Sequence, residues 1–452
     1  MSLASARLGN NVGNIQSGVL YLSYTLSALL GSTFVTKLMG ARNAMILGMV
    51  MYTTYVASFI AAINVSQSFR MPIAALGGAV GGVAAGILWT AQGAYFARVT
   101  EEYKDSTNFE SSNDERIEQP HPLDCPQIEE ITSKLGGIFA AMLLGGELIW
   151  RLFSTISVKY FDLSWRVIFF VYLGISILST FGMIIIYDYK KEGYEEDNDG
   201  HRSIKDNATV TIKMNVNDRK MKYMIPLCAL FGFAASFILS FVNGVALKIS
   251  SIHDTKSAYV GLFSSLTSGV AGLMSLVFGF GYKKIGKGIV LLIGAIAFFM
   301  VGFLFLVVND PKSWNWPFFI AIYTFQGIGR STYEGTLRSR FVDFFGYEKE
   351  GAFANMVLFN GLSTTIGFFI GVYARCSQFS RFCIQYKKDG NIHNILVLEV
   401  LIVVFAVLSM VCYYRALHIY KEEKETRNTR YTLTSQDEKV EETTGEAKQT
   451  FV

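Results

Sequence analysis

Charged residues interrupt two apolar stretches of the sequence, and they are the side chains best suited to bind a charged ligand. Glu147 and Arg151 stand four residues apart, and Arg330, Glu334 and Arg338 follow one another at the same spacing. On a helix this spacing places them on one face, where opposite charges can pair. Placing such a residue within a bilayer costs about 2.5–3.5 kcal/mol on insertion scales, so each one is a candidate functional residue.

Two interpretations of these charges stay open. In the first, a polar cavity between two helix bundles binds an ion or a small anion, and Arg330 or Arg151 supplies the counter-charge. In the second, each pair neutralises itself and holds helices together. We favour the second for Glu147–Arg151. We favour the cavity for Arg330–Glu334, because polar residues such as Tyr333 surround that pair.

The elements that must position these residues are long apolar runs. The chain of 452 residues is 51% hydrophobic and 17% charged. A helix needs about 20 apolar residues to cross a bilayer core, whereas barrel strands are half as long and alternate in polarity. We therefore predict an all-α polytopic membrane protein, integral and multi-pass, in the plasma membrane or an endomembrane. Its eleven transmembrane helices are expected near 15–36, 43–63, 71–97, 134–157, 165–187, 221–247, 257–281, 288–308, 315–337, 351–374 and 393–417.

A short basic turn occurs twice at a constant offset. Lys37 and Gly40 recur as Lys283 and Gly286 (283 − 37 = 246), and a second basic residue, Arg42 or Lys287, follows each glycine closely. A parallel repeat of six spans is the layout of a two-bundle, major-facilitator-like transporter, in which these turns are candidate gates. The second copy has a helix, 221–247, for which the first copy shows no counterpart, so we expect the opening helix to be missing.

The repeat divides the chain into four parts. The first bundle covers 1–187 and includes a polar loop at 98–133, a polar linker covers 188–220, the second bundle covers 221–417, and a polar tail covers 418–452. Most basic turns fall on one side of the membrane, and the positive-inside rule makes that side cytoplasmic. We expect both the loop and the linker to be solvated segments without fixed structure.

The third apolar run contains two patterns. Gly78, Gly82 and Gly86 lie four apart, a spacing that lets two helices approach closely in lipid. Further along, Trp89 and Gln92 complete the candidate cavity. Gln92 stands near the repeat offset from Glu334 (334 − 92 = 242), so the two bundles are expected to place polar groups at matching depth. By contrast, Arg338 and Arg340 are expected to extend to the cytoplasmic membrane interface.

The run from Leu88 to Tyr95, Leu-Trp-Thr-Ala-Gln-Gly-Ala-Tyr, resembles the signature of the uncoordinated-93 family, a branch of the major facilitator superfamily. Gly351-Ala-Phe-Ala-Asn355 is similar to that family's second recurrent element. The resemblance implies a transporter of an ion or small solute that works by alternating access. It equally implies a non-transporting regulatory or escort subunit of an ion channel, of the potassium-channel class, or of a membrane receptor.

The chain departs from this resemblance in its basic turns. The superfamily usually carries an acid three residues before the first glycine of the turn. Here that position holds Lys37 in the first copy and Lys283 in the second. The charge lock that the acid makes is therefore not expected.

Other classes of function find no support in the sequence. The five histidines are scattered without metal-ligand spacing, and there is no phosphate loop, nucleophile elbow or nucleotide fingerprint. We expect no enzyme activity, no cofactor, no metal and no nucleic-acid partner. The lipid bilayer is the expected surrounding of the protein. Cys376 and Cys383 lie in the same outer turn. They either form a disulfide with each other or remain two free thiols. The ending Thr450-Phe451-Val452 fits capture by a carboxylate-binding scaffold domain.

Overall fold

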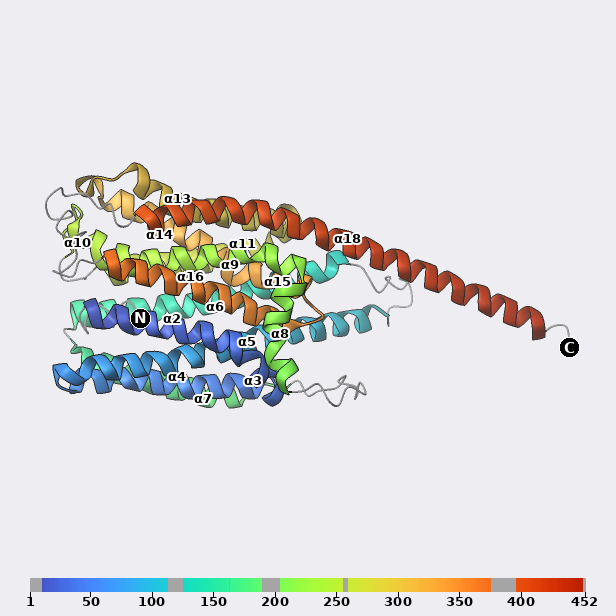
Figure 1. Ribbon diagram of the computed structural model, residues 1–452, viewed down its shortest axis with the longest axis horizontal. Helices are drawn as coiled ribbons and strands as arrows, with labels where there is room; N and C mark the ends of the chain where they lie inside the picture. The colour runs from blue at the N-terminus through green and yellow to red at the C-terminus, as the bar shows by residue number, and fades with distance from the viewer. Residues whose placement is uncertain are drawn as a thin grey trace.

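The computed structural model describes residues 10–112, 125–161, 163–188, 204–254, 259–374 and 396–449, and these residues form helices joined by short connections. Long helices run roughly parallel in one bundle (Figure 1). Helices α3, α8 and α15 lie at one end of it and α10 at the other. We call the first end the basic end, because it carries the turns at Gly40 and Gly286.

The first half of the molecule is a group of helices packed around α5. Helix α2 bends by 58° into α3 after Leu30. Both α2 and α4 pack along α5, and α7 covers the far side of α4. The bounds of these helices are α2 Asn10–Leu30, α3 Ser32–Met39, α4 Ala41–Asn64, α5 Gln67–Ser112, α6 Cys125–Tyr160 and α7 Trp165–Ile184.

The second half follows a connecting helix, α8 (Ile204–Asn217), that lies across the basic end (Figure 1). In this half α9 packs against α16 and α18, and α14 packs between α11 and α13. Two of its spans contain a π-helical stretch, named η1 and η3. The elements are α9 Arg219–Ser236, η1 Phe237–Ala246, α10 Leu247–Ile249, α11 Val260–Phe280, α12 Tyr282–Ile285, α13 Lys287–Val307, η2 Pro311–Ser313, α14 Trp316–Ser331, η3 Thr332–Leu337, α15 Arg338–Phe344, α16 Lys349–Ala374 and α18 Leu396–Gln449.

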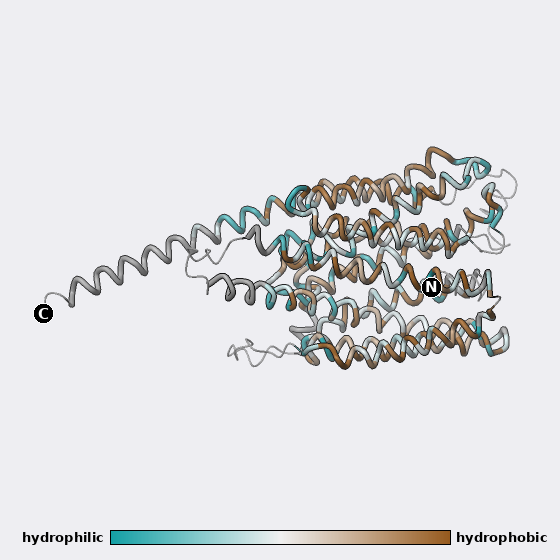
Figure 2. Tube along the Cα trace, turned by 180° about the vertical axis from the view of Figure 1, so that it is seen from behind, coloured by the Kyte–Doolittle hydropathy of each residue, from teal (hydrophilic) through white to brown (hydrophobic). Residues whose placement is uncertain are grey.

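The predicted fold class is confirmed. Nine described helices are long and apolar enough to cross a membrane, and the bent pair α2–α3 makes a tenth. The remaining predicted run, 315–337, is the continuous helix α14–η3–α15, which carries most of the intramembrane charges. Figure 2 shows apolar residues along the length of the bundle and polar residues at its two ends. All eleven apolar runs are thus helical.

The described parts of the polar loop and the linker are helical, so the expectation that they lack fixed structure was wrong for these residues. Helix α5 continues to Ser112, α6 begins at Cys125, and α8 occupies most of the described part of the linker. The polar tail likewise continues α18 to Gln449, well beyond the bundle (Figure 1). Their polar residues find partners on neighbouring helices: Thr211 of α8, for example, hydrogen-bonds Thr33 of α3 at 2.9 Å.

The small residues of α5 lie where α2 approaches most closely. A Cβ atom added at Gly82 would lie 2.1 Å from the carbonyl oxygen of Leu20, and one at Gly78 would lie 2.7 Å from that of Gln16. One added at Gly86 would meet a serine hydroxyl at 2.7 Å. Since contacts this short are sterically forbidden, the two backbones sit at a separation that only glycine permits.

Candidate functional site

A cavity of about 550 Å³ lies between the two halves. Helices α2, α4, α5, α6 and α7 line it from the first half, and α9, η1, α11, α14, η3, α15 and α16 line it from the second. Six of the seven residues predicted for the cavity line it, namely Trp89, Glu147, Arg151, Arg330, Tyr333 and Glu334. The seventh, Gln92, reaches it through a hydrogen bond to Arg338.

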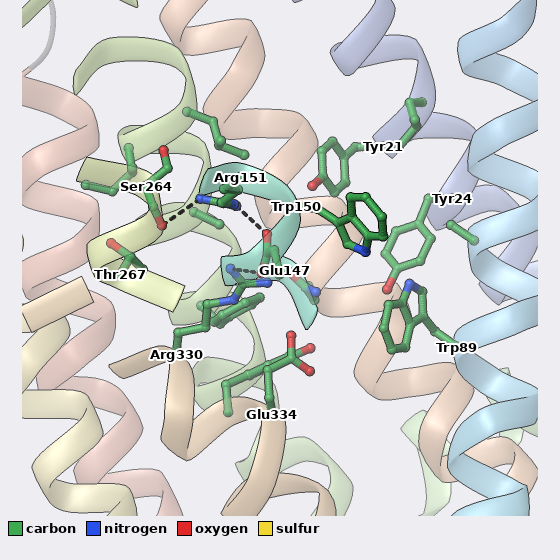
Figure 3. A pocket seen from close by; sticks show the side chains of 18 of the residues that line it. Tyr21, Tyr24, Trp89, Glu147, Trp150, Arg151, Ser264, Thr267, Arg330 and Glu334 are labelled. Atoms are coloured by element: carbon green, nitrogen blue, oxygen red, sulfur yellow. Dashed lines mark hydrogen bonds and ion pairs between the residues drawn. The ribbon is translucent and has the colours of Figure 1, made fainter. Parts of the chain in front are cut away.

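Glu147 stands at the centre of one charge network in the cavity. One of its carboxylate oxygens binds Arg151 on its own helix, and the other lies 2.6 Å from Nη1 of Arg330 on α14. Arg151 also donates to the carbonyl oxygen of Ser264 on α11, at 3.0 Å. Figure 3 shows Glu147 between the two guanidinium groups. The network therefore joins the two halves, whereas the sequence suggested that Glu147 and Arg151 pair only with each other.

Arg338 is the centre of a second network nearer the basic end. It donates to Glu334 at 3.1 Å and to Oε1 of Gln92 at 2.7 Å, and it lies 5.1 Å from the ring of Trp89. Its side chain is only 4% exposed. The expectation that Arg338 extends to the membrane interface was wrong; Glu334 pairs with Arg338, whereas Arg330 pairs with Glu147. Gln92 and Arg338 are 246 residues apart, so equivalent positions of the repeat meet here.

A π-helical stretch lies within the charged stripe. It is η3 (Thr332–Leu337), which contains Glu334 and lies between Arg330 and Arg338. The wider π turn, with i→i+5 hydrogen bonds, shifts the facing of the residues that follow it, and such stretches are frequent at functional sites. The other π-helical stretch, η1, also lines the cavity. Hydrophobic periodicity carries no signal for either one.

Aromatic rings form much of the remaining cavity wall. Seven tyrosines, three phenylalanines and two tryptophans line it, namely Tyr21, Tyr24, Tyr52, Tyr55, Tyr172, Tyr323, Tyr333, Phe59, Phe169, Phe231, Trp89 and Trp150. Most come from the first half and face the charged residues of the second across the cavity (Figure 3). Phe59 and Phe169 are stacked, with their ring centroids 5.7 Å apart. Sequence reasoning identified only Trp89 and Tyr333 of this set, because an aromatic residue in a span is ordinarily core.

Ion pairs between the halves close the basic end. Lys37 of the first basic turn lies 2.7 Å from the carboxylate of Glu348, just before α16. Arg98 of α5 lies 3.3 Å from Glu350 of α16. Lys349 of α16 pairs with Glu101 of α5. These ion pairs differ in polarity from the superfamily's usual lock, because the turn supplies the base, Lys37, and the opposite half supplies the acid, Glu348.

The second basic turn makes corresponding contacts with the other half. Lys283 lies 3.1 Å from Glu130 at the start of α6, and Arg340 lies 3.4 Å from Glu129. Tyr282 donates to Glu129 at 2.8 Å, and burial together with this hydrogen bond raises the pKa of the phenol. The phenol therefore stays protonated and remains a donor. Arg340 is 4% exposed, so its expected place at the membrane interface was also wrong.

Of the two remaining turn residues, Lys287 contacts both halves, whereas Arg42 pairs within its own half. Lys287 is fully buried and lies 2.7 Å from Asp343, and it also hydrogen-bonds Thr132 of α6. Arg42 lies 3.5 Å from Asp188, and both belong to the first half. Both turn glycines, Gly40 and Gly286, have positive φ, at 80° and 75°, so the repeat extends to backbone conformation. Cys376, Cys383 and the ending Thr450–Val452 lie outside the described residues.

Comparison with known proteins shows to which superfamily this architecture belongs. Residues 125–372 match the model of the Major Facilitator Superfamily. The chain belongs to this superfamily. Residues 5–112 match the model described as ion channel regulatory protein UNC-93. UNC93-like protein 3 of Arabidopsis thaliana is 24% identical over 383 residues, covering 81% of this chain and 75% of that protein. The resemblance to the uncoordinated-93 branch is thereby confirmed.

Solved structures of the superfamily share the fold. A variant of the nucleoside transporter NupG has a TM-score of 0.54 at 13% identity, covering 92% of this chain and 94% of its own. The proton:xylose symporter XylE has a TM-score of 0.56 at 12% identity, covering 89% and 87%. At this identity the likeness concerns the arrangement of helices, and the ligands of those proteins say nothing of the ligand here.

Proposed function

We propose that this protein is a transporter of an ion or small solute that works by alternating access. The observation that carries the proposal is the cavity between two repeat-related halves, lined by charges that pair across them. In this proposal the solute enters the cavity from the opposite end while the lock at the basic end is closed. The halves then rock, the ion pairs of Lys37, Arg98 and Lys349 separate, and the solute leaves at the cytoplasmic face.

Flux through liposomes tests this proposal. The purified protein is reconstituted, and currents are recorded after jumps in potassium chloride or sodium benzoate. The Arg330→Gln variant removes one guanidinium while Glu147 keeps Arg151, so we expect a folded protein with little flux. Arg166→Gln, at an exposed site on α7, is the matched control and should transport normally. Equal flux in the wild type and in Arg330→Gln would contradict a role for this cavity.

A regulatory role is the second candidate, and one observation favours it. The UNC-93 model that matches residues 5–112 is described as an ion channel regulatory protein. If this chain regulates a potassium channel or a receptor, the charge networks of the cavity serve chiefly to fix the positions of the helices that contact the partner. Purification in mild detergent followed by mass spectrometry distinguishes the two roles. A stoichiometric channel or receptor subunit favours regulation, whereas a folded protein that comes alone and carries flux favours transport.

A further inference from the structure

We propose that the cavity binds an organic monoanion whose carboxylate sits near Arg151 and Asn243 and whose flat apolar body lies on the aromatic wall. This deepens the proposed function, because it concerns the same site and names a substrate class for it. It rests on the charge balance of the lining, on one buried unpaired donor, and on the shape of the remaining space.

The charge balance leaves one positive charge uncompensated. Three arginines line the cavity, Arg151, Arg330 and Arg338, and two glutamates, Glu147 and Glu334. Both carboxylates already contact an arginine, so the lining carries a net charge of +1 from these groups. An unbalanced charge in a partly desolvated site is costly. A ligand with one negative charge would neutralise the lining, whereas a cation would add to the imbalance.

Asn243 supplies a hydrogen-bond donor that the protein leaves unused. Its Oδ1 accepts from the hydroxyl of Tyr323 at 2.5 Å, which fixes the orientation of the amide. Its Nδ2 is buried and has no hydrogen-bond partner within the part of the chain that the structure describes. The side chain is 6% exposed and lines the cavity. Because an unpaired buried N–H group is costly, a ligand oxygen at this position would be favoured.

Arg151 and Asn243 belong to the same corner of the cavity. Arg151 donates to the carbonyl oxygen of Ser264, and Thr267, three residues later on α11, donates to the carbonyl oxygen of Tyr323 at 3.0 Å. The side chain of Tyr323 in turn holds Asn243. These contacts place Arg151 and Asn243 on the same side of the cavity, and a guanidinium and an amide N–H can each bind one oxygen of a carboxylate.

The aromatic wall and the volume of the cavity indicate the size and shape of the rest of the ligand. A cavity of about 550 Å³ is far larger than an inorganic anion and within the usual range for small organic ligands. Tyr21, Tyr24, Trp89 and Trp150 form one group of rings in the cavity, to the right of Arg330 and Glu334 in Figure 3. Rings in this arrangement can stack on a planar apolar body. Aromatic faces also attract cations, but here the net positive charge opposes them.

Binding of four related probes tests the class of ligand. Benzoate, benzamide, acetate and benzylammonium are titrated by calorimetry into the purified full-length protein in detergent. We expect benzoate to bind at least about tenfold more tightly than the other three, since only benzoate has both the charge and the ring. Equal binding of benzamide or of acetate, or tighter binding of benzylammonium, would overturn the proposal.

Variants test the corner itself. Asn243→Leu and Arg151→Gln should each weaken benzoate binding about tenfold or more. Arg151→Lys, which keeps the charge, should restore part of it. Asn64→Leu, which removes an exposed amide outside the cavity, should bind normally. Tyr323→Phe tests the same corner if Asn243→Leu unfolds, because the amide then loses the hydroxyl that orients it. Wild-type affinity in a folded variant of Asn243 or Tyr323 would refute this site.

Binding and flux together separate this inference from the proposed function. If benzoate binds through Asn243 but no solute crosses the membrane, the ligand class stands and transport fails. If another solute is transported with dependence on Arg330 while benzoate fails to bind, transport stands and the ligand class is wrong.

Discussion

Arg338 is a residue whose loss should destabilise the protein strongly. It is the ion-pair partner of the buried Glu334 and also bonds Gln92 across the halves. Removing one partner of a buried pair costs about 3–5 kcal/mol, because the other charge stays buried alone. We therefore expect Arg338→Met to lower the thermal unfolding temperature in detergent strongly. The double variant Arg338→Met/Glu334→Gln should recover most of the loss, and an unchanged unfolding temperature in the single variant would contradict this account.

A substitution at Lys37 tests whether the ion pairs between the halves keep the basic end closed. Lys37→Glu would place two carboxylates where Lys37 now pairs with Glu348, so the closed state should lose about 1 kcal/mol, roughly a fivefold change in opening. A cysteine introduced at the buried Ala97 of α5 should then react faster with an impermeant maleimide added at the basic end. The reversed pair Lys37→Glu/Glu348→Lys should restore slow labelling.

Arg42→Glu provides the matched control for this experiment. It reverses a charge in the same turn, but the partner, Asp188, lies in the same half. Opening between the halves should not change, so labelling should stay slow. Fast labelling in Arg42→Glu would mean that local unfolding of the turn, and not separation of the halves, exposes the cysteine.

At the scale of elements, the contact between α2 and α5 depends on the absence of side chains. We expect Gly82→Ala to destabilise the protein by about 1–3 kcal/mol, because its Cβ would overlap the backbone of Leu20. Gly174→Ala on α7 is the control, since an added Cβ there meets nothing within 4 Å. A helical alanine in open space should be neutral or slightly stabilising. Thermal unfolding in detergent measures both, and equal effects would argue against close packing.

At the scale of the whole molecule, joining the two halves at the basic end should stop transport. Cysteines at Glu101 and Lys349, which pair across the halves, are linked by a flexible bismaleimide in a protein whose native cysteines have been replaced. We expect flux in liposomes to fall to background. The same linkage between Arg42 and Asp188, within one half, should leave flux intact. Flux that survives the first linkage would contradict a rocking motion of the halves.

The sequence by itself determined the class of the protein and the order of its spans. Length, apolar content and the spacing of the runs are local properties, because each span must satisfy its own backbone in lipid. The offset of 246 residues likewise identified the basic turns at Gly40 and Gly286, whose positive φ the structure then placed at equivalent positions. The sequence also identified four of the five charged residues of the cavity, all except Arg338, since an ionisable residue in an apolar run is unusual.

Only the tertiary structure decided how those charges pair. Glu147 forms an ion pair with Arg330 of the other half, and Glu348 forms one with Lys37, more than 300 residues away. Sequence spacing therefore carries no information about either contact. Glu334 pairs with Arg338 and not with Arg330, although both arginines stand four residues from it, so the spacing does not choose between them. The contacts of the polar segments, such as Glu101 with Lys349 and Glu130 with Lys283, likewise join residues far apart in the chain, and composition alone does not reveal a distant partner.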